Sequence, residues 1–284
     1  MKPIDLLIAF FVPISWGLGL VVAKPVVDGF PPILLMALRF SAAALALAWF
    51  VPIPRSQLPG LFWAALVGVT LQYGFTFYGL RHLDAGTSGL LVQTEAVFLV
   101  LLAAIFLGEP FGLRQVVGMA IAFLGLWMIS GEPRLEGKGF GVALLLTGTV
   151  FWASGQILIR RLGKVDGLTT VAWVAIISSP QLYLLSFLVE GNPVPAITSA
   201  DLGVWGAALY MGLIMTGIGY ACWYHVLGRY PAALTSPFLL LTPVSAVIGG
   251  WLFLGEPLSW NFLLGGAIVT VGVAVLLLER RQRQ

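Results

Sequence analysis

Long apolar runs follow one another along almost the whole chain, and this pattern restricts the possible fold more than any other feature. An α-helix needs about 20 apolar residues to cross a hydrocarbon core of about 30 Å. Cutting the sequence at charged residues, Pro and Gly leaves ten runs of that kind. The predicted spans are 4–23, 32–51, 59–80, 85–107, 112–130, 139–160, 168–189, 202–227, 232–254 and 259–278. The sequence therefore predicts an all-α integral membrane protein with ten transmembrane helices.

The composition excludes several other classes of protein. Of the 284 residues, 59% are hydrophobic and only 10% are charged, which leaves too little polar surface for a body in water. One cysteine, Cys222, and two histidines, His82 and His225, cannot form a disulfide framework or a Cys- or His-rich metal site. We expect no metal and no cofactor. The Lys and Arg residues are scattered between apolar runs, so the net charge of +3 does not predict nucleic-acid binding.

Positively charged residues are distributed unequally between the two ends of the predicted helices. Ten of the fifteen Lys and Arg residues lie on the side of the N-terminus, four lie on the other side, and Arg39 falls inside the second run. Short cytoplasmic loops are enriched in Lys and Arg. The sequence therefore predicts a multi-pass protein whose two termini are both cytoplasmic.

One short motif occurs twice. The letters FLGEP stand at 106–110 and again at 253–257, a separation of 147 residues, each time between two apolar runs. The same shift aligns Tyr73 with Tyr220. A repeat with this period indicates two related halves, an arrangement that is common in transporters.

The opening helices of the two halves are related by a slightly different shift. Trp16 in SWGLGLVVAK aligns with Trp152 in FWASGQILIR at a shift of 136 residues, so about eleven additional residues belong to the second half, most economically at 190–201. Five spans per half is an odd number, so the second half starts on the opposite side of the membrane. We predict two inverted five-helix repeats, residues 1–131 and 138–279.

With the paired LGEP turns, the tryptophans and the segment ALRFSAAAL in the second run, the chain resembles the drug/metabolite transporter (DMT) superfamily, EamA family. The resemblance implies ten helices around a central cavity in the bacterial inner (plasma) membrane. It also implies export of small metabolites, most similar to amino acid exporters, including exporters of aromatic amino acids. One departure is Ala96, preceded by Glu95, which stands where the second half has Pro243. The run 85–107 is therefore expected to be straighter and more polar than the family pattern.

Two charged residues lie well inside predicted spans, where a charge costs about 2.5 to 3.5 kcal/mol on insertion scales. Glu95 lies near the middle of the fourth span, and Arg39 lies in the second. One interpretation is that they bind the amine and the carboxylate of a zwitterionic substrate, or that Glu95 relays a proton. The alternatives are an ion pair between helices, a protonated carboxyl group bonded to a neighbour, and an Arg39 that extends to the interface.

Aromatic and amide side chains supply the remaining candidates for a substrate site. Their spacing places Tyr220, Trp223 and Tyr224 on one helical stripe and Gln72 on another, although Tyr and Trp are also common at membrane interfaces. The predicted substrate-binding residues are Trp16, Arg39, Gln72, Tyr78, Gln93, Glu95, Trp152, Gln156, Tyr220, Trp223 and Tyr224. Glu95 and His225 are the candidates for proton coupling.

Helical geometry limits two of these residues. Gln93 and Glu95 are about 200° apart on a regular helix, so at most one of them is expected to face a central cavity. Glu109 and Glu256 each precede a Pro, and we interpret both as turn formers that complement the positive end of the helix that follows.

Other function classes lack their signatures. The sequence has no H-E-x-x-H, no Walker A loop, no G-x-S-x-G and no pair of Asp residues within the spans, so an intramembrane enzyme is not expected. A channel would need a filter loop or a repeated charged ring, and neither is evident. The prediction is a secondary transporter that exports amino acids by alternating access, with other small organic solutes or drugs as the alternative. Its expected partners are membrane lipid and a small-molecule substrate, and the oligomeric state stays open.

Overall fold

A computed structural model describes residues 1–108, 112–130, 135–162, 166–227, 229–230 and 236–277. Every regular element within these ranges is a helix, which confirms the prediction of an all-α protein. Seven helices of the described chain are long and apolar enough to cross a membrane, and three shorter apolar helices cover 113–129, 238–254 and 260–275. The count of ten spans stays a prediction.

The helices follow the predicted runs, and several runs consist of more than one element. The first group comprises α1 (Pro3–Val27), α2 (Pro32–Leu47) with η1 (Ala48–Phe50), α3 (Leu58–Ala65), η2 (Leu66–Leu71), α4 (Gln72–Leu80), α5 (Ala85–Val92), α6 (Thr94–Leu107) and α7 (Leu113–Ser130). The second comprises α8 (Gly139–Arg161), α9 (Gly167–Glu190), α10 (Pro193–Ser199), α11 (Leu202–Leu209), η4 (Tyr210–Ile218), α12 (Gly219–Leu227), η5 (Ser236–Leu240), α14 (Leu241–Leu254) and α15 (Trp260–Leu277).

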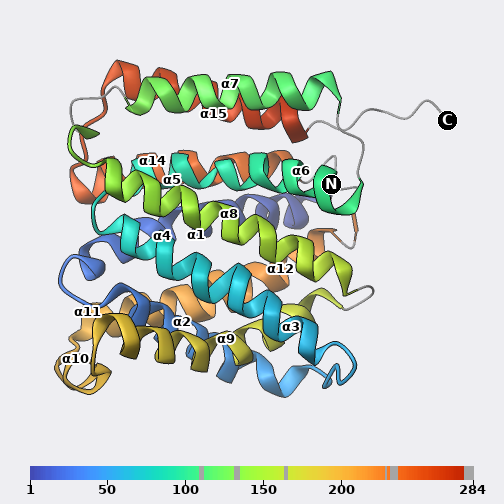
Figure 1. The fold of residues 1–284 in the computed structure, drawn as a ribbon, viewed down its shortest axis with the longest axis vertical. Coiled ribbons are helices and arrows are strands. Elements are labelled where there is room, and N and C mark those ends of the chain that lie inside the picture. Colours follow the sequence, from blue (N-terminus) through green and yellow to red (C-terminus); the bar gives the residue numbers. More distant parts are fainter. Residues whose placement is uncertain (109–111, 131–134, 163–165, 228, 231–235, 278–284) are drawn as a thin grey trace.

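The long helices lie side by side with roughly aligned axes, and together they form a bundle (Figure 1). α1 begins and α15 ends at the same end of this bundle, while the short helix α10 lies at the other end. Neighbours in space are often far apart in sequence, because α1 packs against α14, α2 against α9 and α4 against α8. The pair formed by α7 and α15 lies at one edge of the bundle (Figure 1).

The repeated LGEP motif ends two helices in the same way. Gly108 follows α6 with φ +66° and Gly255 follows α14 with φ +66°, a left-handed conformation that favours glycine at the end of a helix. The two positions are 147 residues apart in the sequence. The backbone therefore repeats with the period of the motif.

The run 85–107 is interrupted although it lacks a proline at position 96, so the expectation of a straighter helix is wrong. α5 ends at Val92 and α6 starts at Thr94, with Gln93 in a turn between them. The Thr94 hydroxyl donates to the Leu91 carbonyl at 2.7 Å, and such a bond to the backbone bends a helix without any proline.

A matching discontinuity occurs in the second half. η5 gives way to α14 between Leu240 and Leu241, 147 residues beyond Gln93 and Thr94. There Pro243, in the first turn of α14, has no N–H to donate to the preceding turn. The interruption therefore occurs at matching positions in both halves, beside the Thr94 hydroxyl in the first and beside Pro243 in the second.

Two segments with π-helical hydrogen bonding, η2 and η4, interrupt the third helix of each half. η2 covers 66–71, and the same residues shifted by 147 are 213–218, which lie within η4. π-turns insert an additional residue into a helix and are frequent at functional sites. Both segments adjoin helices that line the cavity described below.

The contact between α7 and α15 is reciprocal. A Cβ atom at Gly125 would lie 2.6 Å from the Gly265 carbonyl oxygen, and a Cβ atom at Gly272 would lie 2.8 Å from the Gly118 carbonyl oxygen. Adding 147 to 118 and to 125 gives 265 and 272. Gly125 therefore contacts Gly265, the counterpart of Gly118, and Gly118 contacts Gly272, the counterpart of Gly125. Two equivalent surfaces make such reciprocal contacts across a two-fold axis.

Candidate functional site

A cavity of about 420 Å³ lies inside the bundle, within the range that small-molecule sites occupy. Its walls come from α1, α2, α4, α5, α6, α8, α12, α14, α15 and the segments η4 and η5. Its polar and aromatic lining residues are Trp16, Arg39, Gln72, Tyr73, Thr76, Gln93, Glu95, Trp152, Arg160, Tyr220 and Thr242. Many segments that are remote in sequence therefore contribute to one site.

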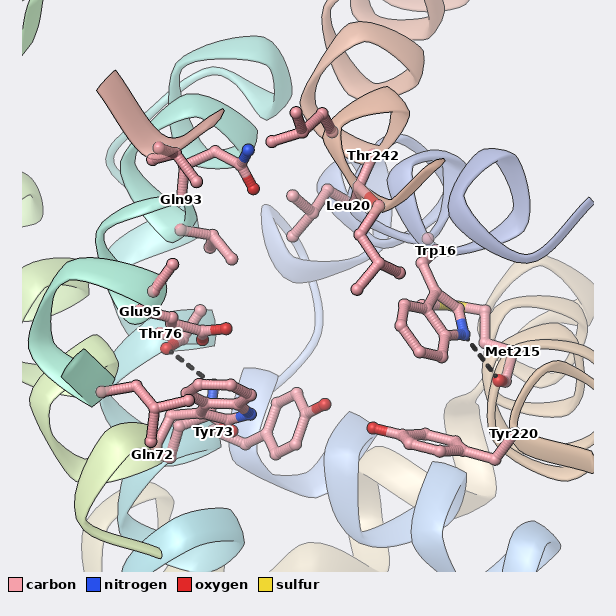
Figure 2. A pocket seen from close by; sticks show the side chains of 18 of the residues that line it. Trp16, Leu20, Gln72, Tyr73, Thr76, Gln93, Glu95, Met215, Tyr220 and Thr242 are labelled. Atoms are coloured by element: carbon pink, nitrogen blue, oxygen red, sulfur yellow. Dashed lines mark hydrogen bonds between the residues drawn. The ribbon is translucent and has the colours of Figure 1, made fainter. Parts of the chain in front are cut away.

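Gln93 and Glu95 both face this cavity (Figure 2). The prediction that at most one of them faces it assumed a regular helix and is wrong. The break at Gln93 changes the rotation between α5 and α6, so that the amide and the carboxyl group line the same wall.

Glu95 presents a carboxyl group to the cavity from the first turn of α6 (Figure 2). Within the described ranges it accepts no hydrogen bond and forms no ion pair, and its side chain is only partly buried. Neither of the two alternatives for this residue, an ion pair between helices or a bond to a neighbour, is seen among these residues. The carboxyl group is thus open to a ligand.

Arg39 lies in the interior of the bundle, with 4% of its surface exposed. Its Nε and Nη2 each donate to Thr216 Oγ1 at 3.2 Å. Its Cζ atom lies 4.8 Å from the centre of the Tyr73 ring and 5.2 Å from that of Phe40. Among residues with a described placement, no carboxylate pairs with this guanidinium. Arg39 is therefore held by neutral groups and does not extend to the interface.

The Trp16 and Tyr220 rings line the side of the cavity across from Gln72 and Glu95 (Figure 2). The Trp16 and Tyr220 ring centres lie 5.0 Å apart, and Trp16 Nε1 donates to the Met215 carbonyl at 3.0 Å. Trp152 lines the cavity from α8. The Trp223 ring centre is 6.3 Å from that of Trp16, and Trp223 is not among the residues that line the cavity.

An amide and a hydroxyl lie next to Glu95. Gln72 Nε2 donates to Thr76 Oγ1 at 3.1 Å, and both side chains are almost fully buried (Figure 2). Gln72 Oε1 has no hydrogen-bond partner among the described atoms. A buried amide oxygen without a partner is costly, and a ligand amine or a protonated carboxyl group would satisfy it.

Four predicted site residues are not placed on the cavity wall. Tyr78 lies near the end of α4 with its ring centre 6.2 Å from that of His82, and neither Gln156 nor Trp223 lines the cavity. The side chain of Tyr224 lies outside the described part of the chain.

His225 is also separate from the cavity. Its Nε2 lies 3.0 Å from Asp5 Oδ1, and the Tyr230 hydroxyl donates to Asp5 Oδ2 at 2.8 Å. These bonds join the end of α12 to the first turn of α1. The arrangement favours a structural link, while proton coupling by this residue stays a prediction.

Sequence reasoning missed several residues of the site. Tyr73 and Thr242 line the cavity, and both were detectable from the spacing of 147, because their counterparts are Tyr220 and Glu95. Thr216 was not detectable, since its contact with Arg39 depends on how η4 packs against α2.

Glu256 caps a helix of the other half, so the prediction that it complements the helix after it is wrong. Its Oε1 accepts the Ala85 N–H at 2.6 Å and its Oε2 accepts the Gly86 N–H at 2.9 Å. These are free donors at the start of α5, where a carboxylate is favoured. The helix that follows Glu256 starts only at Trp260, and Glu109 lies outside the described residues.

A helical membrane protein that encloses a cavity with charged, aromatic and apolar walls has the architecture of a small-molecule transporter. The chain belongs to the EamA-like transporter family, whose model matches residues 4–131 and again residues 139–278. This membership identifies it as a multi-pass membrane transporter of small molecules and confirms the resemblance seen in the sequence motifs.

Three relatives align along nearly the whole chain. A "Probable amino-acid metabolite efflux pump" of Escherichia coli (strain K12) is 28% identical over 99% of this chain and 97% of its own length. An "Uncharacterized transporter" of Archaeoglobus fulgidus is 30% identical, covering 93% and 95%. A "Probable terminal-alkyne amino-acid exporter" of Streptantibioticus cattleyicolor is 28% identical, covering 94% and 91%.

A solved crystal structure also superimposes on this chain. The TM-score is 0.65 at 20% sequence identity, and the superposition covers 98% of both chains. At this identity the match supports the shared fold alone.

Proposed function

We propose that the protein is a secondary transporter that exports amino acids across the bacterial inner membrane. The observation that carries this proposal is a cavity lined by the carboxyl group of Glu95 and by the buried guanidinium of Arg39, neither of which forms an ion pair within the described chain. An amino acid carries an ammonium and a carboxylate on one carbon. Glu95 would bind the ammonium and Arg39 the carboxylate.

The aromatic rings around the cavity support a substrate with a sizeable apolar body. Trp16, Trp152 and Tyr220 offer flat apolar faces, and Val100 of α6 and Val273 of α15 also line the cavity. Such surfaces stabilise an apolar side chain while the charged groups orient its polar end. The printed names of two relatives, an amino-acid metabolite efflux pump and a terminal-alkyne amino-acid exporter, point to the same class of substrate.

Alternating access is proposed to arise from two inverted five-helix repeats, residues 1–131 and 138–279. Support comes from the two separate matches to the family model and from the reciprocal contact of α7 with α15. Further support comes from the interruptions at positions 147 residues apart. Rocking of two such units around a shared cavity exposes it to one side of the membrane and then to the other.

In this conformation the cavity extends towards the end of the bundle where α1 begins. Exposed Arg160, in the last turn of α8, belongs to its lining on that side (Figure 1). At the other end Lys24 Nζ donates to Asp28 at 2.7 Å and to the Leu80 carbonyl at 3.2 Å, which joins α1 to α4. The positive-inside pattern favours a cytoplasmic N-terminal side, and with this orientation we infer an inward-facing state.

The test is transport by the purified protein in proteoliposomes. We expect saturable uptake of at least one amino acid from a panel that includes L-phenylalanine, L-leucine and L-threonine, with counterflow when unlabelled substrate is loaded inside. Counterflow is the mark of a carrier, whereas a channel shows none. Failure to move any amino acid under any imposed gradient would contradict the proposal, and movement of unrelated organic solutes would favour the alternative substrate class.

A further inference from the structure

The guanidinium of Arg39 is held in a way that leaves one of its edges available. Thr216 Oγ1 lies 3.2 Å from Nε and 3.2 Å from Nη2, so it occupies the edge of the guanidinium that these two atoms define. On the other edge, the only hydrogen-bond partner of Nη1 among the described residues is Met36 Sδ at 3.9 Å. The edge formed by Nη1 and Nη2 carries two parallel N–H groups, and it is the fork that binds a carboxylate bidentately.

The direction of the bonds at Thr216 follows from the chemistry of arginine. A guanidinium only donates, so the Thr216 hydroxyl accepts both of its bonds and must give its own proton elsewhere. It donates to the Met211 carbonyl at 3.0 Å, five residues earlier, which is the register of the π segment η4. In an α-helix such a hydroxyl bonds three or four residues back, so the π-turn sets the position of this oxygen.

The segment η4 also holds the backbone of Arg39. A Cβ atom at Gly212 would lie 2.6 Å from the Arg39 carbonyl oxygen and 2.7 Å from Ala42 Cβ. Only a residue without a side chain permits α2 to come this close. One turn of η4 thus fixes the main chain of Arg39 and the next turn fixes its side chain.

The remaining partners of Arg39 are neutral as well. The Tyr73 ring, from α4, covers the guanidinium with its centre 4.8 Å from Cζ. A carboxylate in place of Thr216 would orient the guanidinium equally well, but it would neutralise the charge that a substrate carboxylate needs. A hydroxyl and an aromatic face orient the group and preserve its charge.

We propose that Thr216 is a positioning residue for substrate recognition, which orients the Nη1–Nη2 edge of Arg39 towards the carboxylate of a bound amino acid. The proposal rests on the proposed function, because it concerns the carboxylate end of the same substrate. It adds a residue that does not touch the substrate and acts only through Arg39.

The test compares an amino acid with its carboxamide. L-Phenylalanine and L-phenylalaninamide share the side chain and the ammonium, and only the first has a carboxylate; L-leucine and L-leucinamide form a second pair. Thr216→Val keeps the shape of the side chain and removes the hydroxyl. We expect it to raise the KM for the amino acid about tenfold while Vmax stays within about twofold, and to leave the KM of the amide within about twofold.

Three further variants separate positioning from folding. Thr216→Ser keeps the hydroxyl and should restore the KM to within about threefold of wild type. Thr216→Ala tests the same loss if the valine variant does not fold. Thr147→Val is the matched control, because this exposed threonine of α8 donates only to the Ala143 carbonyl and should change neither KM.

A double-mutant cycle tests whether Thr216 acts through Arg39. In an Arg39→Lys background there is no planar fork to orient, so adding Thr216→Val should change the KM by less than about twofold. An equal rise in KM for the amino acid and for its amide, or an unchanged KM for both, would overturn the positioning role and leave the proposed function standing. If the wild-type protein transports neither amino acid pair nor any other amino acid, the proposed function fails first, and this inference fails with it.

Discussion

The two segments that match the family model interrupt their helices at matching positions beside the cavity but present different chemistry there. Glu95 follows the break between α5 and α6, and Thr242, 147 residues later, follows the junction of η5 and α14; both line the cavity. Likewise Arg39 corresponds, at the shift of 136, to Ala175, which is fully buried and apolar. Both charges near the middle of the cavity therefore come from the first half.

This difference separates two tasks of the fold. Matching interruptions open the wall in both halves, and alternating access requires that geometry to be shared. Recognition has no such requirement, because an amino acid has one ammonium and one carboxylate and therefore no two-fold symmetry. A repeated scaffold with charges in one half can rock symmetrically and still bind its substrate in one orientation.

The largest expected effect concerns the pair Glu95 and Thr242. Glu95→Gln should raise the KM for a transported amino acid by at least about tenfold, since a charge-assisted bond to the ammonium contributes about 1.5 to 3 kcal/mol. Thr242→Val, at the corresponding position, should change it less than about threefold. Transport kinetics in proteoliposomes measure both.

An exchange variant tests the same comparison from the other side. The double variant Glu95→Thr with Thr242→Glu moves the carboxyl group to the other half. Because Arg39 stays on α2, the carboxyl group would no longer be placed correctly relative to it, and the KM should equal that of Glu95→Thr alone. Recovery of the wild-type KM would contradict the asymmetry, since the carboxyl group would then serve equally well from either half.

The second prediction concerns positions where the two halves are alike. Gly125→Ala and Gly272→Ala should lower the free energy of unfolding by similar amounts, about 1 to 3 kcal/mol each, because each new Cβ meets backbone of the partner helix at 2.4 to 2.6 Å. Thermal unfolding in detergent reports both changes. Gly206→Ala is the control, since nothing lies within 4 Å of a Cβ there. Clearly unequal losses would argue against a two-fold relation between α7 and α15.

A smaller loss of stability is expected at the helix cap that joins the halves. Glu256→Gln keeps the shape, but the amide oxygen can accept only one of the two N–H groups of α5, and the amide NH2 cannot accept the other, so we expect a cost of at least about 1 kcal/mol. Glu190→Gln is the natural comparison, because Glu190 accepts the Ile33 N–H at 2.8 Å and the Leu34 N–H at 3.0 Å at the start of α2. Similar shifts in the unfolding temperature would fit two equivalent caps, and no shift for Glu256→Gln would refute its role.

The smallest expected effect separates the two tryptophans. Trp16→Phe removes the bond to the Met215 carbonyl and should cost about 0.6 kcal/mol. Trp152→Phe should cost less, because the described chain offers its indole no hydrogen bond. The same unfolding assay compares the two variants, and a larger loss at Trp152 would show that its ring packing outweighs the bond at Trp16.

Much of the site was accessible from the sequence, because a charge inside an apolar run is conspicuous. Glu95 and Arg39 were found in this way, and the spacing of 147 pointed to Tyr220. The errors came from assuming regular helices. Gln93 joined Glu95 on one wall through the bond between the Thr94 hydroxyl and the Leu91 carbonyl.

Other errors came from contacts across the bundle. Glu256 was assigned to its own turn, yet it caps α5, whose first residue is 171 positions away in the sequence. The contact of His225 with Asp5 at the start of α1 was not foreseen either, while proton transfer by His225 stays a prediction. No local pattern indicates such partners, because they depend on which helices become neighbours.

The sequence by itself determined that the chain lies in a membrane as a set of helices, because apolar runs of this length can satisfy their backbone in lipid in hardly any other way. It also carried the repeated turns and the two intramembrane charges. Only the tertiary structure decided how each helix is rotated, where the breaks redirect side chains, and that Thr216 would meet Arg39. The reason is that insertion into a bilayer depends on the total hydropathy of a run, whereas the shape of a cavity depends on packing between helices. The hydropathy of a run does not determine that packing.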